Sequence, residues 1–203
     1  MTSPGNCEAV TTVYLIRHGR TGLNAAGWLR GRSDPPLDEV GRAEAARLAN
    51  LFAKTKLDAV LTSPLQRAVQ TATPLAASTN APLQSVAAFL DRDYGPWNGR
   101  PRAEAERSYG SLATAPGVEA QPALARRVLA GLREAAEEYA GRGFAIVAHD
   151  AVNRALAAQV DGRFDDPELV PQRTGCWNRL RQAGGAWRVL VVDAVPGDGH
   201  HPD

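Results

Sequence analysis

The sequence predicts an α/β fold: a three-layer α/β/α sandwich around a mostly parallel, doubly wound sheet with an antiparallel edge strand. Short apolar runs alternate with amphipathic helical patterns, which is typical of parallel strands covered by helices on both faces. Towards the carboxyl end, two further apolar segments flank an Ala-Gly-Gly turn, which predicts a closing hairpin. With 203 residues, 44% of them hydrophobic, the chain is long enough to bury the core of one domain.

Short apolar runs in the sequence predict the strands of the sheet. Three runs, 13–16, 59–61 and 144–148, have the continuous apolar character of strands buried on both faces. A further short strand is expected near 84–89. The closing hairpin pairs 176–181 with 186–193.

The predicted helices lie between these strands. In 38–54, apolar or small residues recur every three or four positions, with Asp38 as the N-cap. The dipeptide Ser63-Pro64 is a start signal, with serine as N-cap and proline at the first helical position. The other two helices are expected over 122–140 and from the residue after His149.

The domain organisation follows from the absence of internal repeats and low-complexity linkers. We expect a single domain over 1–203, with an ordered core at about 11–194 and a small cap-like segment at about 92–120. The two ends, 1–10 and 196–203, are rich in Gly, Pro and polar residues, so we expect them to lie outside the core.

Charge and cysteine content exclude several classes of protein. The chain has 23 Lys and Arg against 22 Asp and Glu, so no net positive field favours nucleic acid. Cys7 and Cys176 show no zinc-ligand or disulfide-framework spacing. No apolar run approaches the roughly 20 residues needed to span a bilayer, and no secretory signal pattern is present. We expect a cytoplasmic protein with no nucleic-acid or membrane partner.

Two histidines occupy equivalent positions in the predicted sheet. His18 and His149 each directly follow an apolar strand, and the carboxyl ends of parallel strands form one edge where ligands bind. A single histidine of this kind is more often structural. Two at the same edge favour a functional site.

Arginines accompany these histidines. Arg17 precedes His18, and Arg67 falls in the first turn of the helix that follows the second strand. A helix N-terminus, two guanidinium groups and two imidazoles describe a pocket for a tetrahedral dianion. The basic residues of the chain are arginine except at Lys54 and Lys56, and arginine binds phosphate bidentately where lysine offers a point charge.

Three segments carry a resemblance to a known family. Residues 17–21 read Arg-His-Gly-Arg-Thr, 31–41 contain Asp-Pro-Pro-Leu followed by Gly, and 62–72 read Thr-Ser-Pro-Leu-Gln-Arg-Ala-Val-Gln-Thr-Ala. In this order, the segments resemble the histidine phosphatase superfamily, in its phosphoglycerate-mutase-like branch. The resemblance covers most of the chain and implies the phosphoglycerate-mutase-like fold.

The resemblance also implies a mechanism. His18 is the expected nucleophile, which forms a phosphohistidine. Arg17, Arg67 and His149 are expected to bind the phosphoryl oxygens and stabilise the transition state. No metal and no cofactor are expected. The remaining expected substrate contacts are Gly19, which allows close backbone approach, Thr21, Asn24, Arg30 and Tyr94.

The proton donor is less clear from the sequence. The family has a glutamate four residues before the glycine of a Gly-x-Trp-Glu-Gly segment; that position here is Asp91, and Asp93 is the rival. Proton donation at neutral pH requires a raised carboxyl pKa. The chain also departs from the family at Asn98, where a glutamate is usual, and at Asp150, where a glycine usually follows the second histidine.

These features predict a phosphomonoesterase that hydrolyses a small phosphorylated metabolite through a phosphohistidine on His18. One alternative is a cofactor-dependent phosphoglycerate mutase, which needs the same pocket; the compact stretch from Asp91 to His149 favours hydrolysis. Another is a non-catalytic regulatory member of the fold. A homodimer is the oligomeric state that the resemblance suggests.

Overall fold

In the computed structural model, which describes residues 10–164 and 166–202, six strands form one sheet in the order β3-β2-β4-β1-β5-β6. β1 to β4 are parallel to one another, β5 is antiparallel to β1, and β6 is antiparallel to β5. The mostly parallel sheet with an antiparallel edge is therefore confirmed. The strands are β1 (Thr11–Arg17), β2 (Ala59–Thr62), β3 (Leu83–Ser85), β4 (Gly143–Ala148), β5 (Trp177–Ala183) and β6 (Ala186–Ala194).

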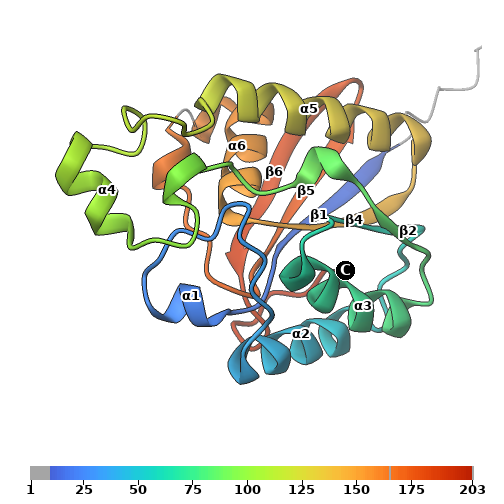
Figure 1. Cartoon of the computed structure of the whole chain (residues 1–203). Coiled ribbons are helices and arrows are strands. Elements are labelled where there is room, and N and C mark those ends of the chain that lie inside the picture. The colour runs from blue at the N-terminus through green and yellow to red at the C-terminus, as the bar shows by residue number, and fades with distance from the viewer. Residues whose placement is uncertain (1–9, 165, 203) are drawn as a thin grey trace, which may run out of the picture.

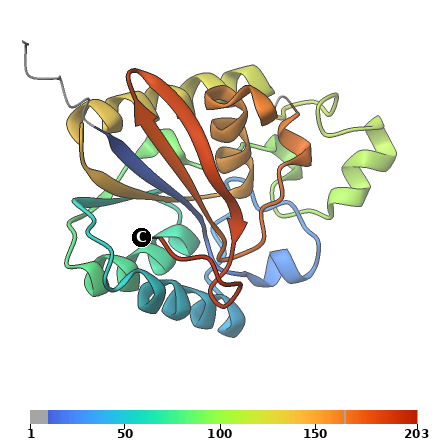
Figure 2. The same cartoon turned by 180° about the vertical axis from the view of Figure 1, so that it is seen from behind.

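Helices cover both faces of the sheet. Figures 1 and 2 show α5 and α6 on one face, α2 and α3 on the other, and α4 standing off to one side. Among the described residues, none of the helices is long and apolar enough to cross a bilayer. The helices are α1 (Gly22–Ala25), α2 (Glu39–Phe52), α3 (Gln66–Thr79), α4 (Arg102–Tyr109), α5 (Gln121–Glu138) and α6 (Asp150–Val160).

The central strand β1 shows why the sandwich forms. Its side chains alternate between the two faces of the sheet. Val13 and Leu15 are buried in the cluster formed with α5 and α6. Tyr14 and Ile16 are buried in the cluster formed with α2 and α3. A continuously apolar strand therefore contributes to two cores at once, which is why the sequence reads as an unbroken apolar run.

A third, smaller cluster lies outside the sandwich. It joins the segment after α1 to the stretch around α4 and buries Leu29, Tyr94, Trp97, Ala105, Leu112 and Ala115. Through this cluster the residues near 30 and the residues near 94 are held beside each other, next to the carboxyl edge of the sheet.

The structure differs from two local expectations. The helix after β2 begins at Gln66 with Leu65 as its N-cap, so Ser63 is not the cap and Pro64 is not the first helical residue; the Ser63 hydroxyl is engaged elsewhere. The strand expected near 84–89 is only Leu83–Ser85, and 87–89 form a 3₁₀ turn.

The carboxyl-terminal stretch also differs from expectation. Pro202 is buried, and its carbonyl oxygen accepts a hydrogen bond from the Tyr14 hydroxyl at 2.7 Å. This end of the chain therefore packs against the sheet. Residues 1–9, the other end expected to lie outside the core, are not among the described residues.

Candidate active site

The carboxyl ends of β1, β2 and β4 bring three segments together. Arg17 of β1 is in register with Ala148 of β4, and the backbone NH of His18 donates to the Ala148 carbonyl at 3.0 Å. The backbone NH of Ser63 donates to Val147 at 3.0 Å. The sheet ladder thus continues one residue past each strand, and it places the His18 and His149 rings 5.2 Å apart between their centroids.

His18 is held in one tautomer. Its Nδ1 lies 2.7 Å from the Gly19 carbonyl oxygen, and its Nε2 accepts a hydrogen bond from Arg67 Nε at 3.2 Å. Because a carbonyl can only accept, Nδ1 carries the proton and Nε2 carries the lone pair. Full burial, together with the charges of Arg67 and Arg17, holds the pKa of His18 well below its usual value. His18 is therefore a neutral imidazole with Nε2 facing the site.

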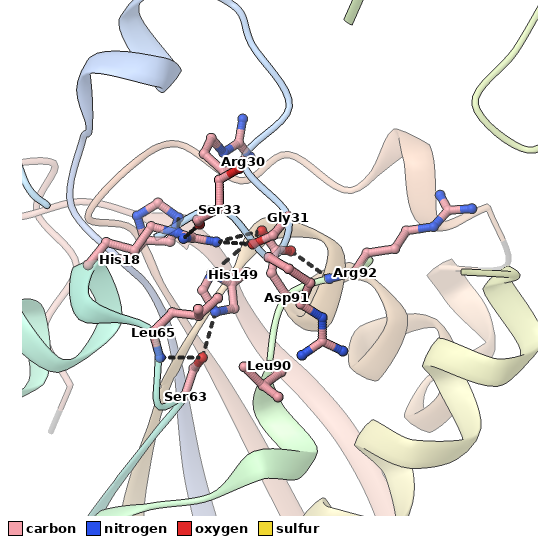
Figure 3. A network of polar contacts seen from close by, with 12 residues as sticks. His18, Arg30, Gly31, Ser33, Ser63, Leu65, Leu90, Asp91, Arg92 and His149 are labelled. Atoms are coloured by element: carbon pink, nitrogen blue, oxygen red, sulfur yellow. Dashed lines mark hydrogen bonds and ion pairs between the residues drawn. The ribbon is translucent and has the colours of Figure 1, made fainter. Parts of the chain in front are cut away.

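Arg67 is fixed by backbone carbonyl groups of the segment 31–33, which covers the site; Figure 3 shows Gly31 and Ser33 of this segment close to His18 and Asp91. The Arg67 Nη1 donates to Ser33 at 2.8 Å, and its Nη2 donates to Gly31 at 2.9 Å. The same Nη2 donates to the Asp91 carboxylate at 2.9 Å. The Arg67 side chain is fully buried, and its guanidinium contacts His18, the candidate acid and the covering segment.

Asp91 lies against both basic groups of the site. Its Oδ2 is 2.9 Å from Arg67 Nη2 and 3.7 Å from His149 Nδ1, and its side chain is fully buried. Its Oδ1 accepts the backbone NH of Arg92 at 2.8 Å. Burial raises the pKa of this carboxyl and outweighs the opposing charge of Arg67. This is the electrostatic setting that a proton donor requires.

Asp93, the rival acid, is in a different setting. Its Oδ1 accepts hydrogen bonds from the Asn98 amide and from the Gly95 backbone NH, both at 2.8 Å. Partial burial favours the neutral acid, but these two hydrogen bonds outweigh it and hold the pKa of Asp93 below its usual range. Asn98, the departure from the family pattern, therefore anchors the loop that follows the candidate acid.

His149 is oriented by a residue that the sequence analysis assigned to another role. Its Nε2 lies 2.8 Å from the Ser63 hydroxyl, and the Leu65 backbone NH donates to the same hydroxyl at 3.3 Å. The His149 Nδ1 is buried with no hydrogen-bond partner among the described residues. Burial, followed by the charge of Arg67 and by His18, holds the pKa of His149 well below its usual value. The Ser-Pro-Leu segment was the only available signal in the sequence, and it predicted a helix N-cap instead.

The Arg17 side chain is held by residues that lie outside β1. Its Nη1 donates to the Gln172 carbonyl, and its Nη2 pairs with Asp150 at 3.4 Å. The Gln172 side chain is fixed in turn by the Asn153 and Asn178 amides at 3.0 and 2.7 Å. No sequence pattern indicated Gln172, because it lies in an irregular segment and contacts Arg17 through its backbone.

The residues expected to contact the substrate have different structural roles. Gly19 packs against α2: a Cβ at this position would lie 2.4 Å from the Gly41 carbonyl oxygen, so close approach to α2 already requires this glycine. Thr21 is the N-cap of α1, and its side chain and that of Asn24 cap each other's backbone NH groups. Tyr94 is buried in the third cluster. Arg30 pairs with Asp150.

The assembled site contains a neutral imidazole that can act as a nucleophile, a carboxyl with a raised pKa, and guanidinium groups that can bind phosphoryl oxygens. His18, Arg67, Asp91 and His149 have no exposed surface. Among the described residues, no group of three or more His, Cys, Asp or Glu side chains is arranged to hold a metal ion.

Comparisons with known proteins agree with this geometry. The chain is 31% identical over 182 residues to "Uncharacterized phosphatase PhoE" of Bacillus subtilis, covering 89% of this chain and 93% of that protein. It is 31% identical to the "Metal-independent phosphoserine phosphatase" of Arabidopsis thaliana over 74% of this chain and 69% of that one. The solved structure of Bacillus stearothermophilus YhfR superposes with a TM-score of 0.84 at 26% identity, covering 91% of this chain and 98% of that chain.

The family comparison covers nearly the whole described structure. The model of the histidine phosphatase superfamily (branch 1) matches residues 13–194. This range includes β2 to β6 and β1 from its third residue onward, together with His18, Arg67, Asp91 and His149. The chain therefore belongs to the histidine phosphatase superfamily, branch 1.

Proposed function

We propose that the protein is a phosphomonoesterase that hydrolyses a small phosphorylated metabolite through a phosphohistidine on His18. The phosphatase names of its relatives support the general activity. One observation carries the finer proposal. A neutral His18, whose Nε2 faces the site, and a buried Asp91, whose pKa is raised, both contact the same Arg67 side chain.

In the first step, His18 Nε2 attacks phosphorus as the bond from phosphorus to the leaving oxygen breaks. The proton of Asp91 goes to that oxygen, so the leaving group departs as an alcohol. In the second step, water gives its proton to the Asp91 carboxylate and attacks phosphorus, which releases phosphate and restores neutral His18. Attack requires the hydrogen bond from Arg67 to Nε2 to be exchanged for one to a phosphoryl oxygen.

The charge that develops on the phosphoryl oxygens needs fixed positive groups. Arg17 and Arg67 are suited to this because carbonyl oxygens hold both guanidinium groups in place. His149 offers its unpartnered Nδ1 at the same place. Apart from the hydrogen bond from Arg67 to His18 Nε2, which must be exchanged, the hydrogen bonds that fix the two guanidinium groups can stay in place during the reaction.

The test is phosphate release over a panel of metabolites by the wild type and by His18→Ala. We expect His18→Ala to lose at least about 10³-fold in kcat/KM while circular dichroism shows that the fold is retained. The control His200→Ala, whose side chain is exposed, keeps full activity. Mass spectrometry after an alkaline quench should detect one added phosphoryl group on the wild type only.

Two results would contradict the proposal. Isomerisation of phosphoglycerate with a bisphosphoglycerate cofactor, without net phosphate release, would favour a mutase. Equal activity of the wild type and His18→Ala would favour a member of the fold without catalysis at this site.

A further inference from the structure

Asp150 forms ion pairs with Arg17 and Arg30 beside the candidate active site. Its Oδ1 and Oδ2 both lie 3.0 Å from Arg30 Nη2, and its Oδ2 lies 3.4 Å from Arg17 Nη2. The three side chains are only 9 to 18% exposed, so solvent screens this cluster weakly. One carboxylate thus neutralises part of the charge of two guanidinium groups.

This cluster lies directly beside the reacting groups. Asp150 follows His149 in the chain, and Arg17 precedes His18. Arg30 precedes Gly31, whose carbonyl accepts from the same Arg67 nitrogen that pairs with Asp91. Arg30 is therefore next in the chain to a residue that contacts Arg67, the partner of the candidate acid, and the leaving group must lie near that acid.

The electrostatics agree with this placement. Burial opposes the charge of Arg30, but the carboxylates of Asp150 and then of Asp91 raise its pKa. Both carboxylates are thus close enough to act on the charge of Arg30. The charges of Arg17, Arg30 and Arg154 overcome burial and hold the pKa of Asp150 well below its usual range, so the carboxylate is ionised whenever the protein is folded at neutral pH.

An arginine close to the leaving group is suited to bind a carboxylate of the substrate, because the planar guanidinium fork matches the geometry of a carboxylate. Here both terminal nitrogens of the fork are engaged: Nη2 is bound to Asp150, and Nη1 donates to the Trp28 carbonyl at 3.3 Å. Only Nε is buried without a hydrogen-bond partner among the described residues. A carboxylate on the leaving group would also meet the negative charge of Asp150, and like charges brought together in a poorly screened site disfavour binding.

We propose that Asp150 is a specificity-determining residue that neutralises Arg30 and so makes the pocket prefer phosphate esters with an uncharged, hydroxyl-bearing leaving group over those that carry a carboxylate. The role of Asp150 in catalysis rests on the proposed function, whereas its role in binding does not. The preference distinguishes this chain from a phosphatase whose substrate, like phosphoserine, bears a carboxylate.

Two compounds test this directly. Glycerol 3-phosphate and 3-phosphoglycerate differ only in a hydroxymethyl group against a carboxylate. We expect the wild type to have the higher kcat/KM with glycerol 3-phosphate, and Asp150→Asn to shift the ratio of the two values towards 3-phosphoglycerate by at least about tenfold. Asparagine keeps an oxygen that can accept from Arg30, so the variant removes the charge while preserving the contact.

The matched control lies at the other end of the same helix. Asp161 is buried and pairs with Arg163 at 2.6 Å, at the carboxyl end of α6, about 16 Å from Asp150 along the helix axis. Asp161→Asn removes a buried, paired carboxylate far from the pocket, and it should leave the substrate ratio unchanged. If Asp150→Asn does not fold, Asp150→Ser, which suits the first turn of a helix, takes its place.

Binding separates this inference from the proposed function. The dissociation constants of both compounds, measured by calorimetry on His18→Ala with and without Asp150→Asn, need no turnover and should show the same shift in preference. If the wild type hydrolyses nothing but the shift appears, the proposed function fails and the role of Asp150 stands. A wild-type preference for 3-phosphoglycerate, or an unchanged ratio in the Asp150 variants, overturns the inference.

Discussion

At the scale of the residue, two aspartates two positions apart lie in opposite electrostatic settings. Asp91 is fully buried beside Arg67, and its pKa is raised. Asp93 accepts two hydrogen bonds that stabilise its charged form, and its pKa is lowered. A proton donor must hold its proton until the leaving oxygen needs it, so the setting of Asp91 suits this role and the setting of Asp93 does not.

We therefore predict that Asp91→Asn lowers kcat by about 10²- to 10⁴-fold for alkyl phosphates. The loss should be much smaller for p-nitrophenyl phosphate, because its leaving group departs without a proton. Asp93→Asn is the matched control and should change kcat less than about tenfold. Equal losses with both classes of substrate would show that Asp91 does not act as the proton donor.

The pH dependence follows from the same groups. Activity requires protonated Asp91, so kcat/KM should fall as pH rises through its raised pKa. It also requires neutral His18, whose pKa lies well below its usual value, so activity should persist on the acid side. In Asp91→Asn the alkaline decline should disappear; a decline that remains there belongs to another group.

At the scale of the element, the contact between the loop after β1 and α2 depends on two glycines. A Cβ on Gly41 would lie 2.0 Å from the Arg20 carbonyl oxygen, and a Cβ on Gly19 would lie 2.4 Å from that of Gly41. Both neighbours are backbone, which cannot rotate away. This close approach holds the loop that follows His18 against the first turn of α2.

We predict that Gly41→Ala destabilises the protein by about 1 to 3 kcal/mol, because the added methyl must displace backbone. Gly22→Ala is the matched control: its Cβ would meet nothing within 4 Å, so its free energy of unfolding should change by less than about 0.5 kcal/mol. Urea unfolding measures both. If the two variants are equally stable, the packing of the loop on α2 is looser than the distances indicate.

The elements also show which features a sequence can reveal. The apolar runs and the Asp38 cap of α2 are local signals, and the structure contains them. The helix α4 carried no such signal, because only Ala105 among its residues is buried and no apolar stripe marks it. Local patterns predict an element only where the element buries a face of its own.

The residues of the candidate active site also divide into those that local patterns predict and those that they do not. Arg17, His18, Arg67 and His149 stand beside strand ends or a helix start, so their meeting could be expected from topology. The partners that orient them could not. Ser63 contacts His149 across 86 positions of the chain, and Arg30 contacts Asp150 across 120. Such pairs depend on how loops pack, and no periodicity in the sequence encodes this.

At the scale of the whole molecule, the burial of two neutral histidines couples the site to folding. The pKa of His18 and that of His149 are held well below the usual value of 6.5, in each case by burial first and by Arg67 next. In the unfolded chain both regain ordinary values near 6.5. Below that pH the unfolded state therefore binds protons that the folded state does not, and stability falls as pH falls.

We predict that the free energy of unfolding decreases by about 1 kcal/mol per pH unit for each of the two histidines as pH falls from about 6 towards 5. Asp91 acts in the opposite direction, since its raised pKa contributes stability that is lost as pH rises through it. Urea unfolding of the wild type and of His149→Gln at several pH values measures the slopes. The variant should lose about half of the acid slope whatever its overall stability, because one of the two buried imidazoles is gone. Equal slopes would mean that His149 is protonated in the folded protein, and a cation at that position would also change how the pocket holds a phosphoryl group.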